Sequence, residues 1–348
     1  MRWIILLVIG VTALVALSSC SSPGIYADRN HYIETKDTNA IDFFMMRWFG
    51  ADDWADQQAE IAANPDLVPM TEISFARILT PSAQPQLTWL GHASFLLQYK
   101  NLNVLTDPIL SERASPVSFA GPERLTPAPL TAAELPPIDY VVISHNHYDH
   151  LDEETILALG DDVVYLVPLG LTEWFVAHGI EASRVREFDW WQQASIGPLE
   201  ITSTPSQHWS ARSLWDKNDT LWTTWHIAIA DWQVWFAGDT GYNAHQFKEI
   251  GERFPAIDLG LIPIGAYQPR WFMKPQHVNP AEALQMHLDI GARHSYAMHW
   301  GTYQLAAEGL AETHQDFTDA LASAELENPG FTRIKIGETL VMDKKPAN

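Results

Sequence analysis

The chain has 348 residues, of which 47% are hydrophobic, so it is long enough and apolar enough to bury a large core. Its 43 acidic and 21 basic side chains give a formal net charge of -22. Nucleic acids are bound by many Lys and Arg side chains that neutralise phosphates, so this charge argues against a nucleic-acid partner. An anionic substrate is still compatible with it if metal ions supply positive charge locally.

The first residues have the features of a secretory signal. Arg2 supplies an early positive charge, residues 4–17 are largely apolar, and small residues precede Cys20, the single cysteine of the chain. The apolar run is shorter than the roughly 20 residues that a membrane-spanning helix needs. The sequence Leu-Ser-Ser-Cys resembles the lipobox of bacterial lipoproteins, in which the cysteine is lipidated and becomes the mature N-terminus.

We therefore expect residues 1–20 to be a lipoprotein signal peptide and Cys20 to be the lipidation site. Lipidation would anchor the protein to a membrane of the bacterial cell envelope. Ser21, in place of an Asp associated with inner-membrane retention, favours the outer membrane. An ordinary signal peptide or a membrane helix is the alternative interpretation.

Residues 21–85 show little strand pattern and are interpreted as a lead-in to the main domain. Residues 41–49 are strongly apolar, and residues 52–63 can form a helix. Packing of the apolar stretch onto the main domain is the first interpretation, and contact with the membrane interface is the alternative. We place the main domain at residues 86–348.

From residue 86 onward, strand and helix patterns alternate. Strands are expected at residues 87–89, 94–98, 104–106, 140–144, 163–167, 199–204, 223–230, 234–237, 259–264 and 296–298. Helices are expected at residues 153–159, 172–178, 244–254 and 280–290. Residues 111–137 are rich in Pro, Ser and Ala and indicate a long loop, which is usually a functional feature. The alternation predicts an α/β fold.

Four potential metal ligands follow the strand at residues 140–144. They are His145, His147, Asp149 and His150. Imidazole and carboxylate groups suit zinc, iron or manganese, and burying them without a partner is costly. The first two ligands are two residues apart, so an extended turn can direct both at one ion, and the other two can then reach a second ion. A surface loop that is rich in His and Asp by chance is the alternative, but composition rarely yields this spacing directly after a strand.

Three further ligands follow other predicted strands: His208, Asp239 and His299. Seven ligands exceed the four of one tetrahedral ion and suit two ions that share a carboxylate. Two ions about 3.5–4 Å apart can activate a hydroxide as the nucleophile of a hydrolysis. Because the ligands are mainly imidazoles and include no thiolate, two Zn²⁺ ions are favoured, with iron or manganese as alternatives.

This ligand pattern resembles the metallo-β-lactamase superfamily, whose αββα sandwich carries two metals at one edge of its sheets. The resemblance implies that one ion is bound by His145, His147 and His208. It implies that the second ion is bound by Asp149, His150 and His299, and that Asp239 bridges the two. It also implies a catalytic role for Asp149 in orienting the nucleophilic water.

The chain is also similar to the N-acyl-phosphatidylethanolamine-hydrolysing phospholipase D family. The similar stretches are residues 88–94, 105–108, 144–152, 207–209, 236–242, 263–273, 276–278 and 299–301. Enzymes of that family release an N-acylethanolamine and phosphatidic acid, so the resemblance implies a phospholipid substrate. Gln268 departs from the acidic residue expected there, which puts recognition of the head group in doubt but not the metals. The lipobox is foreign to the animal enzymes and points to a bacterial relative.

The resemblance suggests roles for other side chains. His277 is a candidate catalytic residue that contacts the substrate phosphate or protonates the leaving alkoxide, with a structural hydrogen bond as the alternative. His92 and Asp107 are expected to support the metal ligands by hydrogen bonds and not to bind metal themselves. Three candidates for substrate contact are Tyr267, Arg270 and Trp271.

Two other functions are compatible with the same residues. The site would also suit another ester, a lactone or a soluble phosphodiester as substrate. A non-catalytic binding lipoprotein of the envelope is the second alternative, but a scaffold has no need of all seven ligands. The oligomeric state is not predicted.

Overall fold

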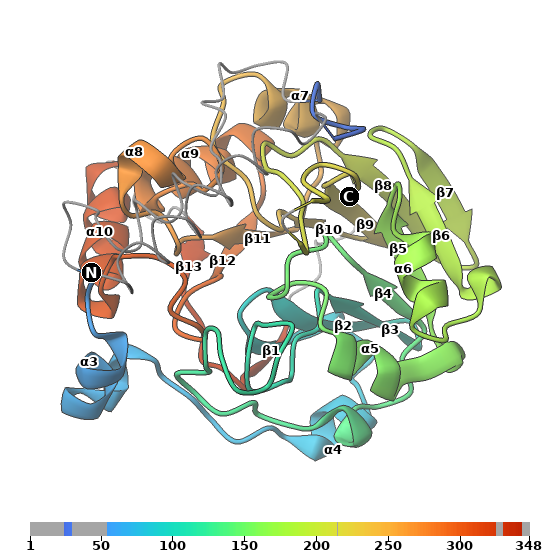
Figure 1. Ribbon diagram of the computed structural model, residues 1–348, viewed down its shortest axis with the longest axis horizontal. Coiled ribbons are helices and arrows are strands. Elements are labelled where there is room, and N and C mark those ends of the chain that lie inside the picture. The colour runs from blue at the N-terminus through green and yellow to red at the C-terminus, as the bar shows by residue number, and fades with distance from the viewer. Residues whose placement is uncertain (1–23, 30–53, 214, 325–329, 343–348) are drawn as a thin grey trace, which may run out of the picture.

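The computed structural model describes residues 24–29, 54–213, 215–324 and 330–342. They form a four-layer sandwich in which two β-sheets lie face to face and helices cover the outer face of each (Figure 1). This architecture confirms the αββα fold class expected from the sequence. The residues interpreted as a signal peptide, Cys20 and the apolar stretch at 41–49 lie outside the described residues.

The first sheet has the strand order β14-β1-β2-β3-β4-β5-β6. Its strands are β1 (Gln86–Gly91), β2 (Ser94–Tyr99), β3 (Leu102–Thr106), β4 (Tyr140–Val142), β5 (Val164–Pro168), β6 (Val185–Phe188) and β14 (Thr339–Val341). The strands from β14 to β3 pair antiparallel, and those from β3 to β6 pair parallel. The parallel strands β4 and β5 thus both point their carboxyl ends to one edge of the sheet.

The second sheet has the order β13-β12-β11-β10-β9-β8-β7. Its strands are β7 (Gln193–Ile196), β8 (Leu199–Thr204), β9 (Thr224–Ile229), β10 (Trp232–Phe236), β11 (Leu259–Pro263), β12 (His294–Met298) and β13 (Phe331–Thr332). Strands β10 to β13 pair parallel. The central strand β11 is buried on both faces, which explains its continuous apolar run.

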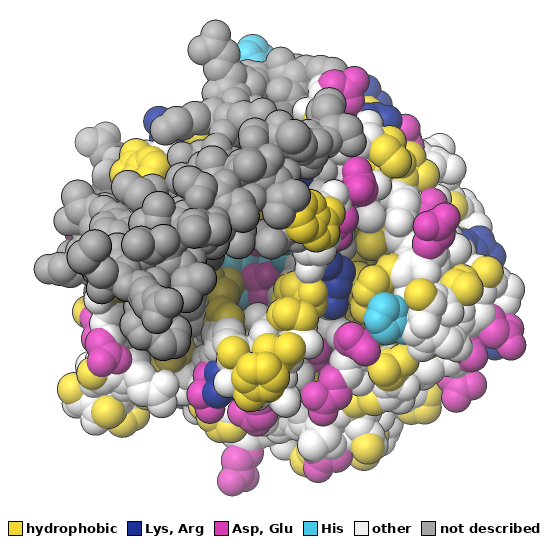
Figure 2. Space-filling model, viewed as in Figure 1, with side chains coloured by type: hydrophobic (Ala, Val, Ile, Leu, Met, Phe, Trp, Pro, Cys, Tyr) yellow, Lys and Arg dark blue, Asp and Glu magenta, His cyan; other side chains and the backbone are white. Residues whose placement is uncertain are grey.

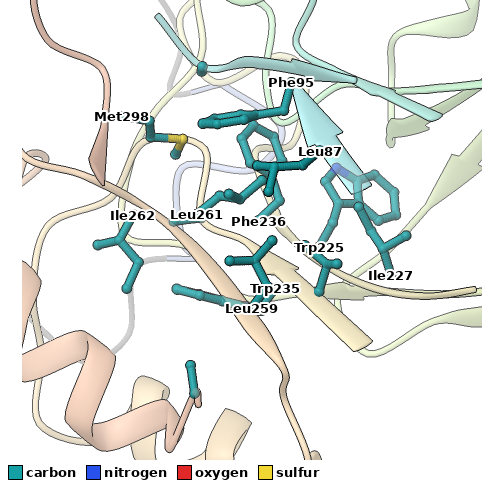
Figure 3. Close-up of a cluster of buried hydrophobic side chains, with 14 of the residues drawn as sticks. Leu87, Phe95, Trp225, Ile227, Trp235, Phe236, Leu259, Leu261, Ile262 and Met298 are labelled. Atoms are coloured by element: carbon teal, nitrogen blue, oxygen red, sulfur yellow. The ribbon is translucent and has the colours of Figure 1, made fainter. Parts of the chain in front are cut away.

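The main core lies between the two sheets (Figure 3). Leu87 and Phe95 of the first sheet pack in the same cluster as Trp225 and Phe236 of the second. All four side chains are completely buried. Apolar burial contributes about 25 cal/mol per Å², so these large side chains are a principal source of the attraction between the sheets.

Helices cover both outer faces. On the first sheet lie α4 (Phe75–Leu79), α5 (Glu153–Leu159) and α6 (Thr172–Ala177), and on the second lie α7 (Gln246–Arg253), α9 (Pro280–Ile290) and α10 (Leu310–Ser323). The shorter elements are α3 (Gln57–Ala63), α8 (Arg270–Met273), and the 3-10 helices η1 (Pro65–Leu67), η2 (Ala132–Glu134), η3 (Gly160–Asp162) and η4 (Ala182–Arg184). Within the described parts of the chain, no helix is both long enough and apolar enough to cross a membrane.

Several observed elements differ from the sequence-based expectation. Strands β6, β7, β13 and β14 and helices α4, α8 and α10 were not predicted. Helix α10 buries only a few of its side chains, among them Thr313 and Ala320, so its apolar face is weak in sequence. The helix expected at residues 52–63 is observed from Gln57, because Asp56 caps its first turn by accepting a hydrogen bond from the Ala59 amide.

Candidate metal centre

The first group of ligands is carried by the turn that follows β4. The amides of His150 and Leu151 both donate to the carbonyl of His147, at 3.1 and 2.9 Å. This single helical turn brings Asp149, four residues after His145, to the same cluster as His145. Asp152 holds the end of the turn, because its carboxylate accepts hydrogen bonds from Thr155 and from the Ser111 hydroxyl.

The remaining ligands come from three strand ends of the second sheet. His208 follows β8, Asp239 follows β10 and His299 follows β12. Gly238 has a φ of +52°, and a Cβ atom at that position would lie 2.4 Å from the Cβ of Ser144. A glycine is therefore required where the loop of β10 passes the loop of β4.

Three histidines form one half of the cluster. The Nε2 of His145 lies 2.8 Å from the Nδ1 of His147, and the Nε2 of His208 lies 3.3 Å from the same atom. The Oδ2 of Asp239 is 3.9 Å from His145 Nε2 and 3.8 Å from His208 Nε2. These nitrogens converge on one point, as ligands of one ion do.

Two histidines and a carboxylate form the other half. The Nε2 atoms of His150 and His299 are 3.2 Å apart, and each lies 3.3 Å from the Oδ2 of Asp149. Asp239 reaches this half as well, with its Oδ2 3.1 Å from His150 and its Oδ1 3.1 Å from His299. Asp239 thus lies between the two halves, in the position that a bridging ligand requires.

The donor atoms of the cluster fit metal ions. Imidazole nitrogens that face one another at 2.8–3.3 Å repel through their lone pairs unless a proton or a cation lies between them. The buried Nε2 of His147 has no hydrogen-bond partner among the described residues. A set of imidazoles and carboxylates with no thiolate suits zinc, iron or manganese.

The two halves differ electrostatically. Burial lowers the pKa of His147 to about 3 and that of His208 to about 4, so at neutral pH both present lone pairs for binding a cation. Burial acts in the same direction on His299, but the charges of Asp239 and Asp149 outweigh it and raise its pKa to about 9. Without a metal ion, the second half therefore pairs carboxylates with the protonated imidazole of His299. A bound dication can supply this positive charge in place of the proton.

Asp107 and Ser144 orient ligands from behind. Asp107 Oδ2 lies 2.6 Å from the Nδ1 of His150, and Asp107 Oδ1 accepts the amide of Ser144 at 2.6 Å. The hydroxyl of Ser144 donates to Asp107 at 2.5 Å and lies 2.8 Å from the Nδ1 of His145. One buried pair thus contacts rings in both halves and can hold their orientation, and the supporting role of Asp107 stays a prediction.

His92 and Gln276 contact other ligands. The Nε2 of His92 lies 3.0 Å from the Oδ2 of Asp149, and His92 has a φ of +51° in the turn between β1 and β2. The Nδ1 of His208 lies 2.9 Å from the carbonyl oxygen of Gln276. Sequence reasoning missed Gln276, because a main-chain carbonyl carries no side-chain signal.

His277 lies at the solvent side of the cluster. Its Nδ1 is 3.9 Å from the Oδ2 of Asp239, and its ring centre is 5.1 Å from that of His208. Its side chain is 12% exposed, against 2% for Asp239. Figure 2 shows histidine and acidic side chains at the floor of a hollow, with hydrophobic side chains on its rim. A group entering from solvent would meet His277 before it met Asp239.

The predicted substrate contacts Tyr267 and Arg270 have other partners in the structure. The hydroxyl of Tyr267 donates to Asp316 on α10 at 2.8 Å. The Arg270 guanidinium pairs with Glu282 at 2.7 Å and donates to the carbonyls of Tyr267 and His277. Neighbouring elements thus satisfy polar groups of both residues, and their contact with a substrate stays a prediction. Trp271 is 48% exposed and stays a prediction.

Comparison with known proteins places the chain in a family. The Beta-lactamase superfamily domain matches residues 102–300. N-acyl-phosphatidylethanolamine-hydrolyzing phospholipase D 1 of Caenorhabditis elegans is 40% identical over 266 residues, which are 72% of this chain and 74% of that protein. The mitochondrial N-acyl-phosphatidylethanolamine-hydrolyzing phospholipase D of Saccharomyces cerevisiae is 37% identical over 65% of this chain and 49% of that protein.

A solved structure agrees in fold. A possible metal-dependent hydrolase from Veillonella parvula superposes with a TM-score of 0.61 and 18% identity, over 75% of this chain and all of that one. The family match, the identity to the worm protein and the histidine–aspartate cluster lead to one conclusion. The chain belongs to the metallo-β-lactamase superfamily and is a metal-dependent hydrolase of that fold.

Proposed function

We propose that the protein hydrolyses N-acyl-phosphatidylethanolamine-type phospholipids to N-acylethanolamine and phosphatidic acid, with two zinc ions held by the cluster. The observation that carries the proposal is the complete set of seven ligand side chains, with Asp239 between the two halves. The 40% identity to a worm protein named for this lipid supports the choice of substrate.

The reaction adds water to a phosphodiester. The water oxygen forms a bond to phosphorus, the bond from phosphorus to the ethanolamine oxygen breaks, and the leaving alkoxide takes up a proton. Zinc ions at the cluster would supply Lewis acidity, which lowers the pKa of water and neutralises the phosphate oxygens. Since the chain carries a net charge of -22, a local source of positive charge suits an anionic substrate.

Two side chains are suited to act on the reacting groups. Asp149 is 13% exposed and bonded to His92, so its carboxylate is held firmly where water can reach it and be oriented by it. Burial holds the pKa of His277 well below its usual value, so at neutral pH this imidazole is uncharged and can donate one N–H to a phosphate oxygen.

The proposal includes a membrane location. A lipid on Cys20 would hold the protein on the envelope membrane. Substitution of Cys20 tests this location. Trp271 is the second residue of α8 and is 48% exposed. It is proposed as a contact for the apolar part of the lipid. Replacing Cys20 with Ser is expected to release the protein from membrane fractions and abolish labelling by a radioactive fatty acid.

The test combines metal counting with product analysis. Full-length protein is purified in detergent, its metals are counted by mass spectrometry, and release of phosphatidic acid from N-acyl-phosphatidylethanolamine in mixed micelles is followed. We expect about two zinc ions per chain and metal-dependent release. The variant His147→Ala should lose bound zinc and the release of phosphatidic acid. The control variant His226→Gln changes a buried histidine outside the cluster and should keep its zinc and its activity.

Other outcomes would reject one part of the proposal, either the substrate or the metal dependence. Two ions without lipid turnover would retain the site and reject the substrate, and lactones and soluble phosphodiesters would then be assayed. Lipid turnover that persists after complete chelation would reject the metal-dependent mechanism.

A further inference from the structure

Glu308 is a buried carboxylate outside the metal cluster. It is 4% exposed, and no basic side chain of the described residues forms an ion pair with it. Its Oε1 accepts the amide of Ala266 at 2.6 Å, and its Oε2 accepts the amide of Gln268 at 3.0 Å. Burial raises the pKa of Glu308, and these main-chain hydrogen bonds act against the shift. A carboxylate buried without a countercharge is costly, so its two bonds to one loop need an explanation.

That loop, residues 265–268, is pressed against a metal ligand. A Cβ atom at Gly265 would lie 2.2 Å from the carbonyl oxygen of His299, so only glycine permits this approach. Ala266 has a φ of +61°, a left-handed conformation that is unfavourable for a residue other than glycine. The two hydrogen bonds that the Glu308 carboxylate accepts therefore stabilise a backbone conformation that is unfavourable for Ala266.

The same loop is connected to His277. The amide of Arg270 donates to the side-chain oxygen of Gln268 at 3.1 Å. The Arg270 guanidinium in turn donates to the carbonyls of Tyr267, at 3.2 Å, and His277, at 3.0 Å. A displacement of residues 266–268 would thus be transmitted to His277 through Arg270.

Glu308 is itself fixed from its other side. The side chain of Gln57 on α3 donates to the carbonyl of Glu308 at 2.7 Å, and the amide of Ala307 donates to the carbonyl of Gln268 at 3.1 Å. The carboxylate of Glu60 accepts the amide of Leu310 at 2.6 Å, at the start of α10. The stretch that carries Glu308 is therefore held rigidly between α3 and the loop.

We propose that Glu308 is a positioning residue for the hydrolysis: its buried carboxylate fixes residues 265–268, and through them the placement of His277 and of the backbone at His299. The expected effect on kcat rests on the proposed function. The structural part of the inference concerns the chain alone and can be measured without turnover.

The test substitutes Glu308→Gln, which keeps the size of the side chain but turns one acceptor into a donor that faces an amide N–H. The matched control is Glu252→Gln, an exposed position on α7. Both variants and the wild type are compared as full-length, metal-loaded protein by metal content, by kcat and KM on N-acyl-phosphatidylethanolamine micelles, and by amide hydrogen exchange.

The expected result is local. Glu308→Gln should retain its metals and its KM and lose about 10- to 100-fold in kcat, because small misplacements of reacting groups have effects of that size. Amides in residues 265–278 should exchange faster, while those of β9 and β10 should not change. The control should match the wild type in every measurement.

Three results would overturn the inference. They are an unchanged exchange at residues 265–278, faster exchange throughout the chain, and an unchanged kcat in a variant whose loop has loosened. If the wild type does not hydrolyse the lipid, the proposed function fails and hydrogen exchange alone decides. Local loosening that reaches residue 277 would then support the positioning role, and its absence would reject it.

Discussion

The two sheets contribute to the metal centre in different ways. The first sheet supplies His145, His147, Asp149 and His150 from one turn after β4, within six residues. The second sheet supplies one ligand from each of three separate strands, β8, β10 and β12. The first set is fixed mainly by local sequence, whereas the second is assembled only when the sheet has formed and packed.

The two groups of ligands depend on different contacts: the first on neighbours in the chain, the second on contacts between distant strands. The turn after β4 keeps its ligands near one another in any compact state of the chain. Asp239 and His299 come together with it only through the register of β10, β11 and β12 and the contact of Gly238 with Ser144. Metal binding should therefore report on the correct packing of the second sheet against the first.

The largest effect is expected at Asp239, whose carboxylate lies between both halves and is the proposed bridging ligand. Asp239→Asn removes a charge that lies 3.1 Å from both His150 and His299. We expect loss of at least one metal per chain and a fall in activity beyond the 10- to 100-fold typical of residues that only support ligands. Metal counting and kcat/KM at saturating zinc measure it. A variant with two metals and near-normal kcat/KM would contradict the bridging assignment.

An intermediate effect is expected at Asp107, whose carboxylate lies beside His145 and His150 and contacts the Nδ1 of His150. Asp107→Asn weakens the contact to His150 and leaves the amide of Ser144 with a poorer acceptor. A loss of about 10- to 100-fold in zinc affinity or activity is expected. Competition with a fluorescent chelator gives the affinity. A loss as large as that of Asp239→Asn would place Asp107 among the ligands.

The smallest effect is expected at a histidine of the second sheet that is not a ligand. His226 on β9 is stacked on Phe254 and lies 3.2 Å from Gln233 Oε1. Burial lowers its pKa to about 4 from 6.5. Below pH 6.5 the unfolded chain therefore binds a proton that the folded chain does not, so stability present above that pH is lost as the pH falls toward 4.

The variant His226→Gln removes this dependence. The unfolding free energy of the wild type relative to the variant should fall by about 2 kcal/mol between pH 7.5 and pH 5. Urea denaturation of both metal-loaded proteins at the two pH values measures it, and the response of the metal centre cancels in the difference. A constant difference would mean that His226 titrates alike in both states.

The seven side chains named as metal ligands could be found from the sequence because each follows a predicted strand. The structure brings all seven of these side chains into one cluster. Long-range partners were harder to anticipate. Helix α10 has a weak apolar face, and β13 and β14 have two and three residues, too few for a periodic pattern. The roles of Glu308 and Gln276 depend on main-chain contacts that no motif encodes.

Tyr267 and Arg270 have protein partners in the structure, so their predicted contact with a substrate stays a prediction. Both residues lie in the stretch that most strongly suggested a lipid substrate, yet their polar atoms bond to Asp316, Glu282 and main-chain carbonyls. A family-like segment can therefore be retained for the architecture around a site. Contact with a substrate needs the geometry as well as the sequence.

The pairing of β14 with β1 has a consequence for biosynthesis. The last described strand, with three residues, covers an edge of β1, which has six buried residues. Because β14 lies far after β1 in the chain, a ribosome makes β1 first, and the emerging chain carries this unpaired edge until β14 has been made. Exposed edges of that length recruit strands of other chains. A nascent chain stalled before residue 339 is therefore a template for aggregation, and protection of this edge depends on the three residues of β14.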